Sequence, residues 1–305
     1  MKVFVTGVGG QLGHDCVNEL LKRGCEAVGS DIQARYSGID DGSAVTTAPY
    51  VQLDITDREA VLRTIGKIAP DAIIHCAAWT AVDAAEDEAN RAKVDAINHL
   101  GTRYIAEAAK AVDAKMIYIS TDYVFDGQGE RPWQPDDTNY APLNVYGATK
   151  LKGEQAVRSL LEKYFIVRIA WVFGLNGKNF IKTMLNVGRK HPTVRVVDDQ
   201  IGTPTYTLDL ARLLADMVET DKYGCYHATN EGGYISWYDF TREIYRQAGL
   251  GTSVVPVTTA EYGLSVAARP FNSRLDKRKL VESGFDPLPD WRDALSRYLA
   301  EIGEV

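Results

Sequence analysis

The feature that most constrains the fold of this chain is its opening stretch, MKVFVTGVGGQLG, in which an apolar run leads into spaced glycines. An apolar strand that enters a glycine turn and opens a helix is typical of the phosphate-binding start of a dinucleotide fold. Gly7 permits the tight turn, Gly10 lets the backbone approach a pyrophosphate, and Gly13 allows close packing of helix on strand. Because the free N–H groups of such a helix attract phosphates, the G-x-x-G-x-x-G spacing predicts nucleotide binding.

The size and charge of the chain exclude some classes of protein. Its 305 residues, 45% of them hydrophobic, are enough to bury a substantial core. A net charge of −7 argues against a nucleic acid or an anionic membrane as a partner. No signal peptide precedes the first strand and no apolar run is long enough for a membrane span, so we expect a cytoplasmic protein. The cysteines form no C-x-x-C pair and the histidines show no zinc-site spacing, so we predict reduced thiols and no metal.

Strand and helix patterns alternate through the first half of the chain, and this alternation predicts a mostly parallel sheet. The expected strands cover residues 3–5, 26–30, 50–53, 71–76, 116–119 and 165–169. We therefore expect an α/β fold with a doubly wound, Rossmann-type parallel sheet and a smaller, discontinuous C-terminal α/β substrate domain. The dinucleotide-binding domain is expected at 1–172, with 200–224 returning to it, and the substrate region at 173–199 and 225–305.

The ends of the expected strands carry residues that suit a nicotinamide dinucleotide. Asp31 ends the second strand eighteen residues beyond Gly13, where a carboxylate hydrogen-bonds the adenine ribose. Asp31 repels a 2′-phosphate and so favours NADH, whereas Arg35 would offset this repulsion and admit NADPH, so these residues leave the choice of nicotinamide open. Residues after the third and fourth strands would lie against the cofactor: Asp54, Ile55, Ala77 and Ala78.

A second group of residues predicts acid–base chemistry. Thr121 follows the fifth strand, at the sheet edge where ligands bind, and Tyr146 and Lys150 share one face of a later helix. An adjacent ammonium stabilises a phenolate, so Lys150 is expected to lower the pKa of Tyr146 toward neutral pH. Asn98, in a long helix expected at 91–111, is compatible either with a solvated position or with a side chain that holds a water or a backbone carbonyl near the site.

Together, the glycine turn, Thr121 and the Tyr146-x-x-x-Lys150 pair resemble the extended short-chain dehydrogenase/reductase superfamily. Longer strings, spread over nearly the whole chain, are similar to one branch of it, the dTDP-4-dehydrorhamnose reductases. These strings are TGVGGQLG (6–13), CAAWTAVDAAE (76–86), ISTDYVFDG (119–127), RIAWVFG (168–174), KNF (178–180), DQIGTPT (199–205) and ARPFNSRLD (268–276).

This resemblance implies roles for individual residues. The catalytic triad would be Thr121, Tyr146 and Lys150. The cofactor would be bound by Gly7, Gly10, Gln11, Leu12, Gly13, Asp31, Asp54, Ile55, Ala77, Ala78, Thr80, Tyr146 and Lys150. The substrate would be bound by Val82, Asp83, Thr121, Asp122, Tyr123, Trp171, Asp199, Gln200 and Arg269. Taken without the resemblance, Trp171 fits a core position better than a sugar-stacking one, and Arg269 fits a surface salt bridge as well as a phosphate clamp.

The resemblance also implies a reaction, namely reduction of the C4 keto group of a dTDP-6-deoxy-4-ketohexose, as in dTDP-rhamnose biosynthesis. It further implies that both NADH and NADPH are used. Some relatives bind Mg²⁺ at a subunit contact, but no residue pattern in this chain supports Mg²⁺, and a homodimer is compatible with the sequence. Another sugar-nucleotide reductase, an epimerase or a dehydratase would share the same fold, although Asp122-Tyr123 supplies only one of the two acids that a 4,6-dehydratase uses. A catalytically silent regulatory subunit and a nucleotide-sensing protein are also compatible with this fold.

Overall fold

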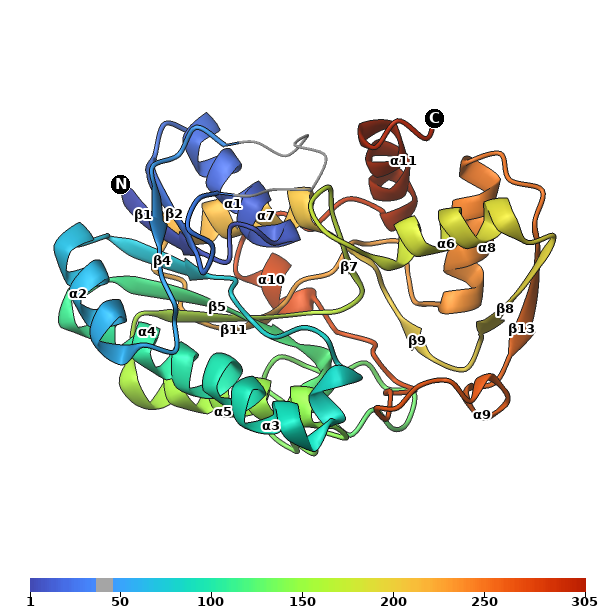
Figure 1. Cartoon of the computed structure of the whole chain (residues 1–305), viewed down its shortest axis with the longest axis horizontal. Helices are drawn as coiled ribbons and strands as arrows, with labels where there is room; N and C mark the ends of the chain where they lie inside the picture. Colours follow the sequence, from blue (N-terminus) through green and yellow to red (C-terminus); the bar gives the residue numbers. More distant parts are fainter. Residues whose placement is uncertain (37–45) are drawn as a thin grey trace.

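A seven-stranded parallel sheet forms the centre of the larger part of the molecule (Figure 1). The computed structural model describes residues 1–36 and 46–305. The strand order is β11-β6-β5-β4-β1-β2-β3, and every neighbouring pair is parallel. The order reverses between β1 and β4, which is the crevice where ligands bind in open α/β sheets. This topology confirms the predicted doubly wound fold. The strands are β1 (Lys2–Thr6), β2 (Glu26–Asp31), β3 (Tyr50–Gln52), β4 (Ala72–His75), β5 (Lys115–Thr121), β6 (Tyr164–Ile169) and β11 (Gly224–His227).

Helices cover both faces of this sheet. Side chains alternate along each buried strand, so both faces of the sheet are apolar and each packs against helices. On β1, Val3 and Val5 join the apolar cluster beneath α1 (Gln11–Lys22) and α7 (Thr207–Val218). Phe4 points to the opposite cluster, beneath α2 (Arg58–Ile68), α4 (Thr102–Ala111) and α5 (Val145–Leu160). Both layers are visible in Figure 1, with α1 and α7 above the sheet and α2, α4 and α5 below it.

The long helix expected at 91–111 is interrupted. It begins earlier, as α3 (Glu88–Asp95), passes through a π-helical turn, η2 (Ala96–Gly101), and continues as α4. Single π-helical turns inside α-helices are frequent at functional sites. This turn contains Asn98, whose side chain is completely buried, so a solvated position is excluded.

The smaller part of the molecule is built from short strands and helices around an aromatic core, drawn at the right of Figure 1. Phe173 stacks on Tyr206 with ring centroids 5.1 Å apart, and Tyr298 meets both rings edge-on. The paired strands are β7 (Val172–Phe173) with β10 (Thr205–Tyr206), β9 (Ile201–Gly202) with β12 (Ile235–Ser236), and β8 (Thr193–Val197) with β13 (Ser253–Val257). The remaining elements of the whole described chain are η1 (Ala84–Glu86), η3 (Asp122–Val124), α6 (Phe180–Lys190), α8 (Trp237–Gln247), α9 (Thr259–Tyr262), α10 (Arg278–Glu282) and α11 (Trp291–Glu301).

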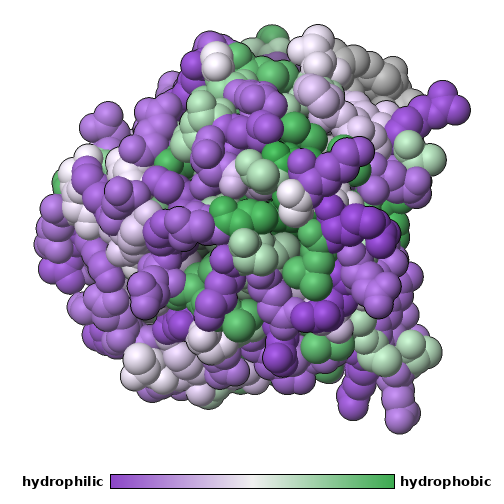
Figure 2. Space-filling model, turned by 90° about the vertical axis from the view of Figure 1, so that its left-hand side faces the viewer, coloured by the Kyte–Doolittle hydropathy of each residue, from purple (hydrophilic) through white to green (hydrophobic). Residues whose placement is uncertain are grey.

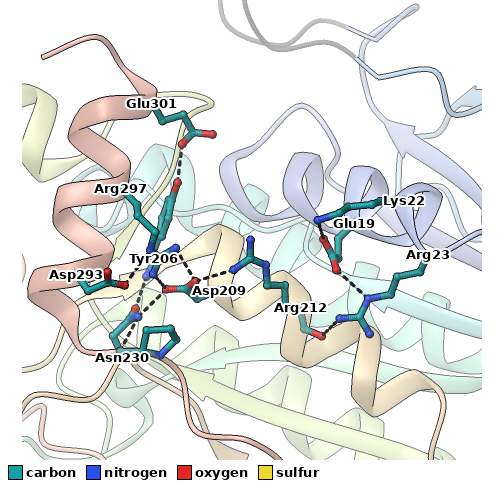
Figure 3. Close-up of polar contacts among 11 residues, drawn as sticks. Glu19, Lys22, Arg23, Tyr206, Asp209, Arg212, Asn230, Asp293, Arg297 and Glu301 are labelled. Carbon is teal, nitrogen blue, oxygen red and sulfur yellow. Dashed lines mark hydrogen bonds and ion pairs between the residues drawn. The ribbon is translucent and has the colours of Figure 1, made fainter. Parts of the chain in front are cut away.

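Ion pairs around α7 join the two parts (Figure 3). The buried carboxylate of Asp209, on α7, accepts two hydrogen bonds from Arg297 of α11, at 2.8 and 2.7 Å, and one from Asn230. On the other side, Arg23 of α1 donates to the backbone carbonyl of Arg212 at 3.1 Å. Helix α7 is thus fixed to the first helix of the chain and to the last.

The face that carries the amino ends of the parallel strands is mainly hydrophilic, with hydrophobic groups in separate patches (Figure 2). In the described ranges, 1–36 and 46–305, none of the helices combines the length and the hydropathy that crossing a membrane requires.

Candidate active site

A cleft of about 770 Å³ runs along the carboxyl ends of the central strands and reaches the smaller part of the molecule. It contains residues from the first turn, from the ends of β2, β4 and β5, and from α5, as expected for a ligand site at the carboxyl edge of a parallel sheet. Eighteen of the residues predicted to bind cofactor or substrate line it: Gly7, Gly10, Gln11, Leu12, Gly13, Asp31, Asp54, Ile55, Ala77, Ala78, Thr80, Val82, Thr121, Asp122, Tyr123, Tyr146, Lys150 and Trp171.

The glycine turn has the geometry of a phosphate cradle. Gly7 has φ of 72°, and a Cβ there would lie 2.6 Å from the backbone N of Ala77. A Cβ on Gly13 would lie 2.2 Å from the carbonyl oxygen of Gly7, so helix and turn touch only because this residue has no side chain. Gly10 is the N-cap of α1 and offers no side chain to the first free N–H groups. These groups therefore remain available to an anion in the cleft, which fits the pyrophosphate of a dinucleotide.

Asp31 supports the same turn from the end of β2. Its two carboxylate oxygens accept hydrogen bonds from the backbone N–H of Gly9, at 2.9 Å, and of Ile32, at 2.7 Å. The carboxylate also lines the cleft, and each oxygen can accept a further hydrogen bond. This position suits an adenine ribose.

Thr121, Tyr146 and Lys150 meet at the centre of the cleft. Thr121 ends β5, and the other two residues lie on the first turns of α5, whose N-cap Asn144 accepts a hydrogen bond from the N–H of Gly147 at 2.8 Å. The Nζ of Lys150 donates to the carbonyl oxygen of Ile119 at 2.7 Å. This bond fixes the ammonium to the strand that carries the threonine.

The electrostatics of this group differ from the sequence-based expectation. Burial raises the pKa of Tyr146, and the nearby carboxylate of Asp122 raises it further, while the hydrogen bond between Tyr146 and Thr121 lowers it in part. The prediction that Lys150 lowers the phenol pKa toward neutral pH is wrong, since burial and Asp122 prevail. Burial lowers the pKa of Lys150 itself to about 7, so at neutral pH the amine carries only part of a charge.

A buried, neutral histidine supports the backbone beneath the cleft through hydrogen bonds. Burial lowers the pKa of His75 to about 3. Thr102 donates its hydroxyl proton to the carbonyl of Asn98, at 2.8 Å, so it accepts from Nε2 of His75, at 3.1 Å. The Nδ1 atom then accepts from Thr6, at 2.7 Å, and the Thr6 oxygen accepts from the N–H of Ala77, at 3.2 Å. The chain of hydrogen bonds fixes the backbone that packs on Gly7.

Asn98 holds the loop after β4. Its Oδ1 accepts from the backbone N–H of Trp79 at 2.8 Å, and its Nδ2 donates to the Trp79 carbonyl and to the Thr149 hydroxyl, both at 3.2 Å. Of the two roles compatible with the sequence, the structure supports a side chain that holds backbone near the site.

The predicted substrate residues divide into two groups. Trp171, at φ of 52°, lines the cleft and stacks on Trp237 with ring centroids 3.7 Å apart, and it also packs against two apolar clusters, so it lies between core and cleft. Arg269 forms an ion pair with Asp83 at 2.5 Å and a long hydrogen bond to the hydroxyl of Tyr123, so it borders the cleft through Tyr123.

Asp199 and Gln200 lie elsewhere. Asp199 accepts hydrogen bonds from the backbone N–H and hydroxyl of Thr259, at the start of α9, and Gln200 donates to the same hydroxyl at 2.9 Å. Neither is among the cleft residues of the described chain.

Several lining residues were not predicted from the sequence. Lys93, Lys178 and Trp237 line the cleft, and Lys93 lies 5.7 Å from the ring centroid of Trp79. The string KNF at 178–180 was the only sequence signal for one of them. Across residues 1–36 and 46–305, no group of three or more His, Cys, Asp or Glu side chains is placed to hold a metal ion.

Comparison with known proteins agrees with this geometry. The family model described as RmlD substrate binding domain matches residues 1–303. The dTDP-4-dehydrorhamnose reductase of Streptomyces griseus is 40% identical over 299 residues, which cover 96% of this chain and 91% of that protein. The spore coat polysaccharide biosynthesis protein SpsK of Bacillus subtilis is 38% identical and covers 98% of this chain and 97% of its own length. The crystal structure of dTDP-4-dehydrorhamnose reductase from Bacillus anthracis in complex with NADP is similar with a TM-score of 0.88, at 39% identity, covering 98% of this chain and 99% of that one.

Proposed function

This chain belongs to the RmlD substrate binding domain family, which includes the dTDP-4-dehydrorhamnose reductases, and we propose that it is an NAD(P)H-dependent oxidoreductase of that kind. The proposed reaction reduces the C4 keto group of dTDP-4-dehydro-L-rhamnose to give dTDP-L-rhamnose, the last step of dTDP-rhamnose biosynthesis. The observation that carries the proposal is the meeting of Thr121, Tyr146 and Lys150 in one cleft with the glycine turn.

In this proposal a reduced nicotinamide, when bound, supplies the hydride that forms the new C–H bond at C4. Tyr146 donates its phenolic proton to the carbonyl oxygen as that oxygen gains charge, so the ketone becomes an alcohol and the phenol becomes a phenolate. Thr121 lies beside Tyr146, and its hydroxyl, which donates to Asp122 in this structure, would turn to donate a hydrogen bond to the same oxygen. Lys150 is held next to them by the Ile119 carbonyl and supports the phenolate that remains.

We propose that both NADH and NADPH are used. Asp31 retains acceptor capacity for a ribose hydroxyl, and the side chain of Arg35 is exposed near the same strand end, where it can meet a 2′-phosphate. The NADP in the Bacillus anthracis relative supports the second cofactor.

We assign the cofactor to residues 1–172 together with 200–224, and the sugar nucleotide to 173–199 and 225–305. The pairing of β11 with β6 and the packing of α7 over the same apolar cluster as α1 support a discontinuous division. We further propose that the enzyme acts in the cytoplasm, and sedimentation of the purified chain tests whether it is a homodimer.

The loss of NADPH or NADH absorbance tests the function, with dTDP-4-dehydro-L-rhamnose generated in situ and Tyr146→Phe as the matched control. We expect oxidation of both cofactors by the wild-type enzyme, and at least a ~100-fold loss of rate in Tyr146→Phe with cofactor binding retained. Binding of cofactor without turnover of this sugar by the wild-type chain would overturn the reductase assignment and favour another 4-ketosugar or a regulatory subunit.

A further inference from the structure

Asp122 is a buried acid that the proposed reaction does not use directly. It follows Thr121 at the start of η3, lines the cleft and is only 2% exposed. Its Oδ1 accepts a hydrogen bond from the Thr121 hydroxyl at 2.9 Å. Its Oδ2 is also buried, and no hydrogen-bond partner for it occurs in the part of the chain that the structure describes. A buried carboxylate with an unpaired oxygen exerts an electrostatic effect that solvent screens weakly.

The groups around Asp122 do not neutralise it. From α5, the phenol of Tyr146 faces it, and the ring of Tyr123 packs edge-on against the Tyr146 ring with centroids 5.7 Å apart. From the segment before the last helices, Arg269 approaches Tyr123, but its guanidinium forms an ion pair with Asp83. The Asp122 charge therefore acts on the phenols of both Tyr146 and Tyr123.

A further cation, Lys150, lies one helical turn beyond Tyr146 on α5. Its Nζ donates to the Ile119 carbonyl, and its ammonium lies 4.2 Å from the ring centroid of Tyr118. The hydroxyl of Ser273 also faces Asp122, and it lowers the pKa of that carboxyl without bringing a charge.

We propose that Asp122 is a positioning residue that keeps the proton on Tyr146 and so holds this site ready for reduction, an inference that rests on the proposed function. Two effects act in the same direction. The carboxylate repels the negative charge of a Tyr146 phenolate, and it takes the single hydroxyl proton of Thr121, which would otherwise stabilise that phenolate.

These contacts determine how the rates of reduction and of the reverse oxidation change with pH. Burial raises the pKa of Asp122 to about 6, so the carboxylate is charged above that pH and its effect on Tyr146 is present at neutral pH. Burial and Asp122 together raise the pKa of Tyr146, which keeps the phenol a proton donor. In the reverse direction Tyr146 must be a phenolate to accept the alcohol proton, so oxidation of the product begins only at higher pH.

The matched variants Asp122→Asn and Asp126→Asn test this inference. Asp126 lies in the same loop, where it accepts a hydrogen bond from the backbone N–H of Gln128, and it does not line the cleft. The pH profile for oxidation of dTDP-L-rhamnose by NADP⁺ is measured for wild type and both variants. We expect the pH at which oxidation sets in to move down by about 1–2 units in Asp122→Asn and to stay in place in Asp126→Asn.

A second readout needs neither substrate nor cofactor. The tyrosinate absorbance of each enzyme is titrated beside that of its Tyr146→Phe derivative, and the difference gives the ionisation of Tyr146 alone. An equal downward shift is expected in Asp122→Asn, and Asp122→Ser replaces it if the asparagine variant does not fold. An unchanged midpoint would overturn the inference, whereas a wild-type enzyme without turnover would overturn the proposed function and leave this titration to decide the role of Asp122.

Discussion

Replacing Gly13 by alanine tests whether the close contact of α1 with the glycine turn is what builds the phosphate cradle. An ideal Cβ would lie 2.2 Å from the Gly7 carbonyl oxygen and 2.6 Å from the Gly7 carbonyl carbon, both rigid backbone atoms. Ordinary contact needs a further ~1 Å, so the helix must move away from the turn. Overpacking of this kind costs about 1–3 kcal/mol, of which the helix preference of alanine returns at most about 1 kcal/mol.

The same movement displaces the N–H groups that face the phosphates, so the dissociation constant for NADPH should rise at least ~10-fold. Binding is followed by cofactor fluorescence and stability by urea denaturation. Two control variants bracket the result. Gly10→Ala places its Cβ 3.3 Å from the same oxygen and should disturb stability less, while Gly66→Ala, in α2 with open space around its Cβ, should stabilise by about 0.5–1 kcal/mol. Normal NADPH affinity in Gly13→Ala would refute the reasoning.

Three further substitutions test the buried polar groups. Lys150 has a pKa lowered to about 7 when folded, against an ordinary value of 10.5, so the folded chain binds fewer protons between these values and stability should rise with pH from about 7 toward 10. Lys150→Met should remove that slope from urea denaturation curves, and an unchanged slope would contradict the burial argument. Asp209→Asn removes the buried one of the two carboxylates that pair with Arg297, the other being Asp293, and should cost about 2 kcal/mol in the same assay, because the arginine is one-third exposed; no loss would show the buried pair to be dispensable. Asn98→Ala frees the loop at Trp79 and should lower kcat more than cofactor affinity, and equal losses in both would indicate a general loss of structure.

The central sheet was predictable because its signals are local. The apolar run before Gly7, the acid that ends β2 and the alternation of strands with helices each depend on a few neighbouring residues. Six of the seven strands differ from the expected ranges by two residues or fewer, as for β5, which extends to Thr121, whereas β11 was not among the expected strands. Residues at the ends of parallel strands meet at one edge, so most cofactor residues predicted from sequence position lie together in the cleft.

The contacts of the smaller part depend on pairings that sequence periodicity does not encode. Asp199 follows β8 and binds the start of α9, sixty residues away, through Thr259. The place of Trp171 depends on Trp237, which comes from another helix. The π-helical turn around Asn98 has the composition of an ordinary helix, and only its contact with the Trp79 backbone shows what it is for.

The contrast between local signals and distant contacts is clearest in the electrostatics of Thr121, Tyr146 and Lys150. The spacing of Tyr146 and Lys150 indicated which side chains meet, but not the protonation state of either, because a pKa depends on burial and on partners from distant segments. Ile119 holds the amine, and Asp122 raises the phenol pKa that the helical pair was expected to lower. A phenol kept protonated suits a donor in ketone reduction. The reversal of that one expectation is therefore consistent with the reaction that the sequence itself suggested.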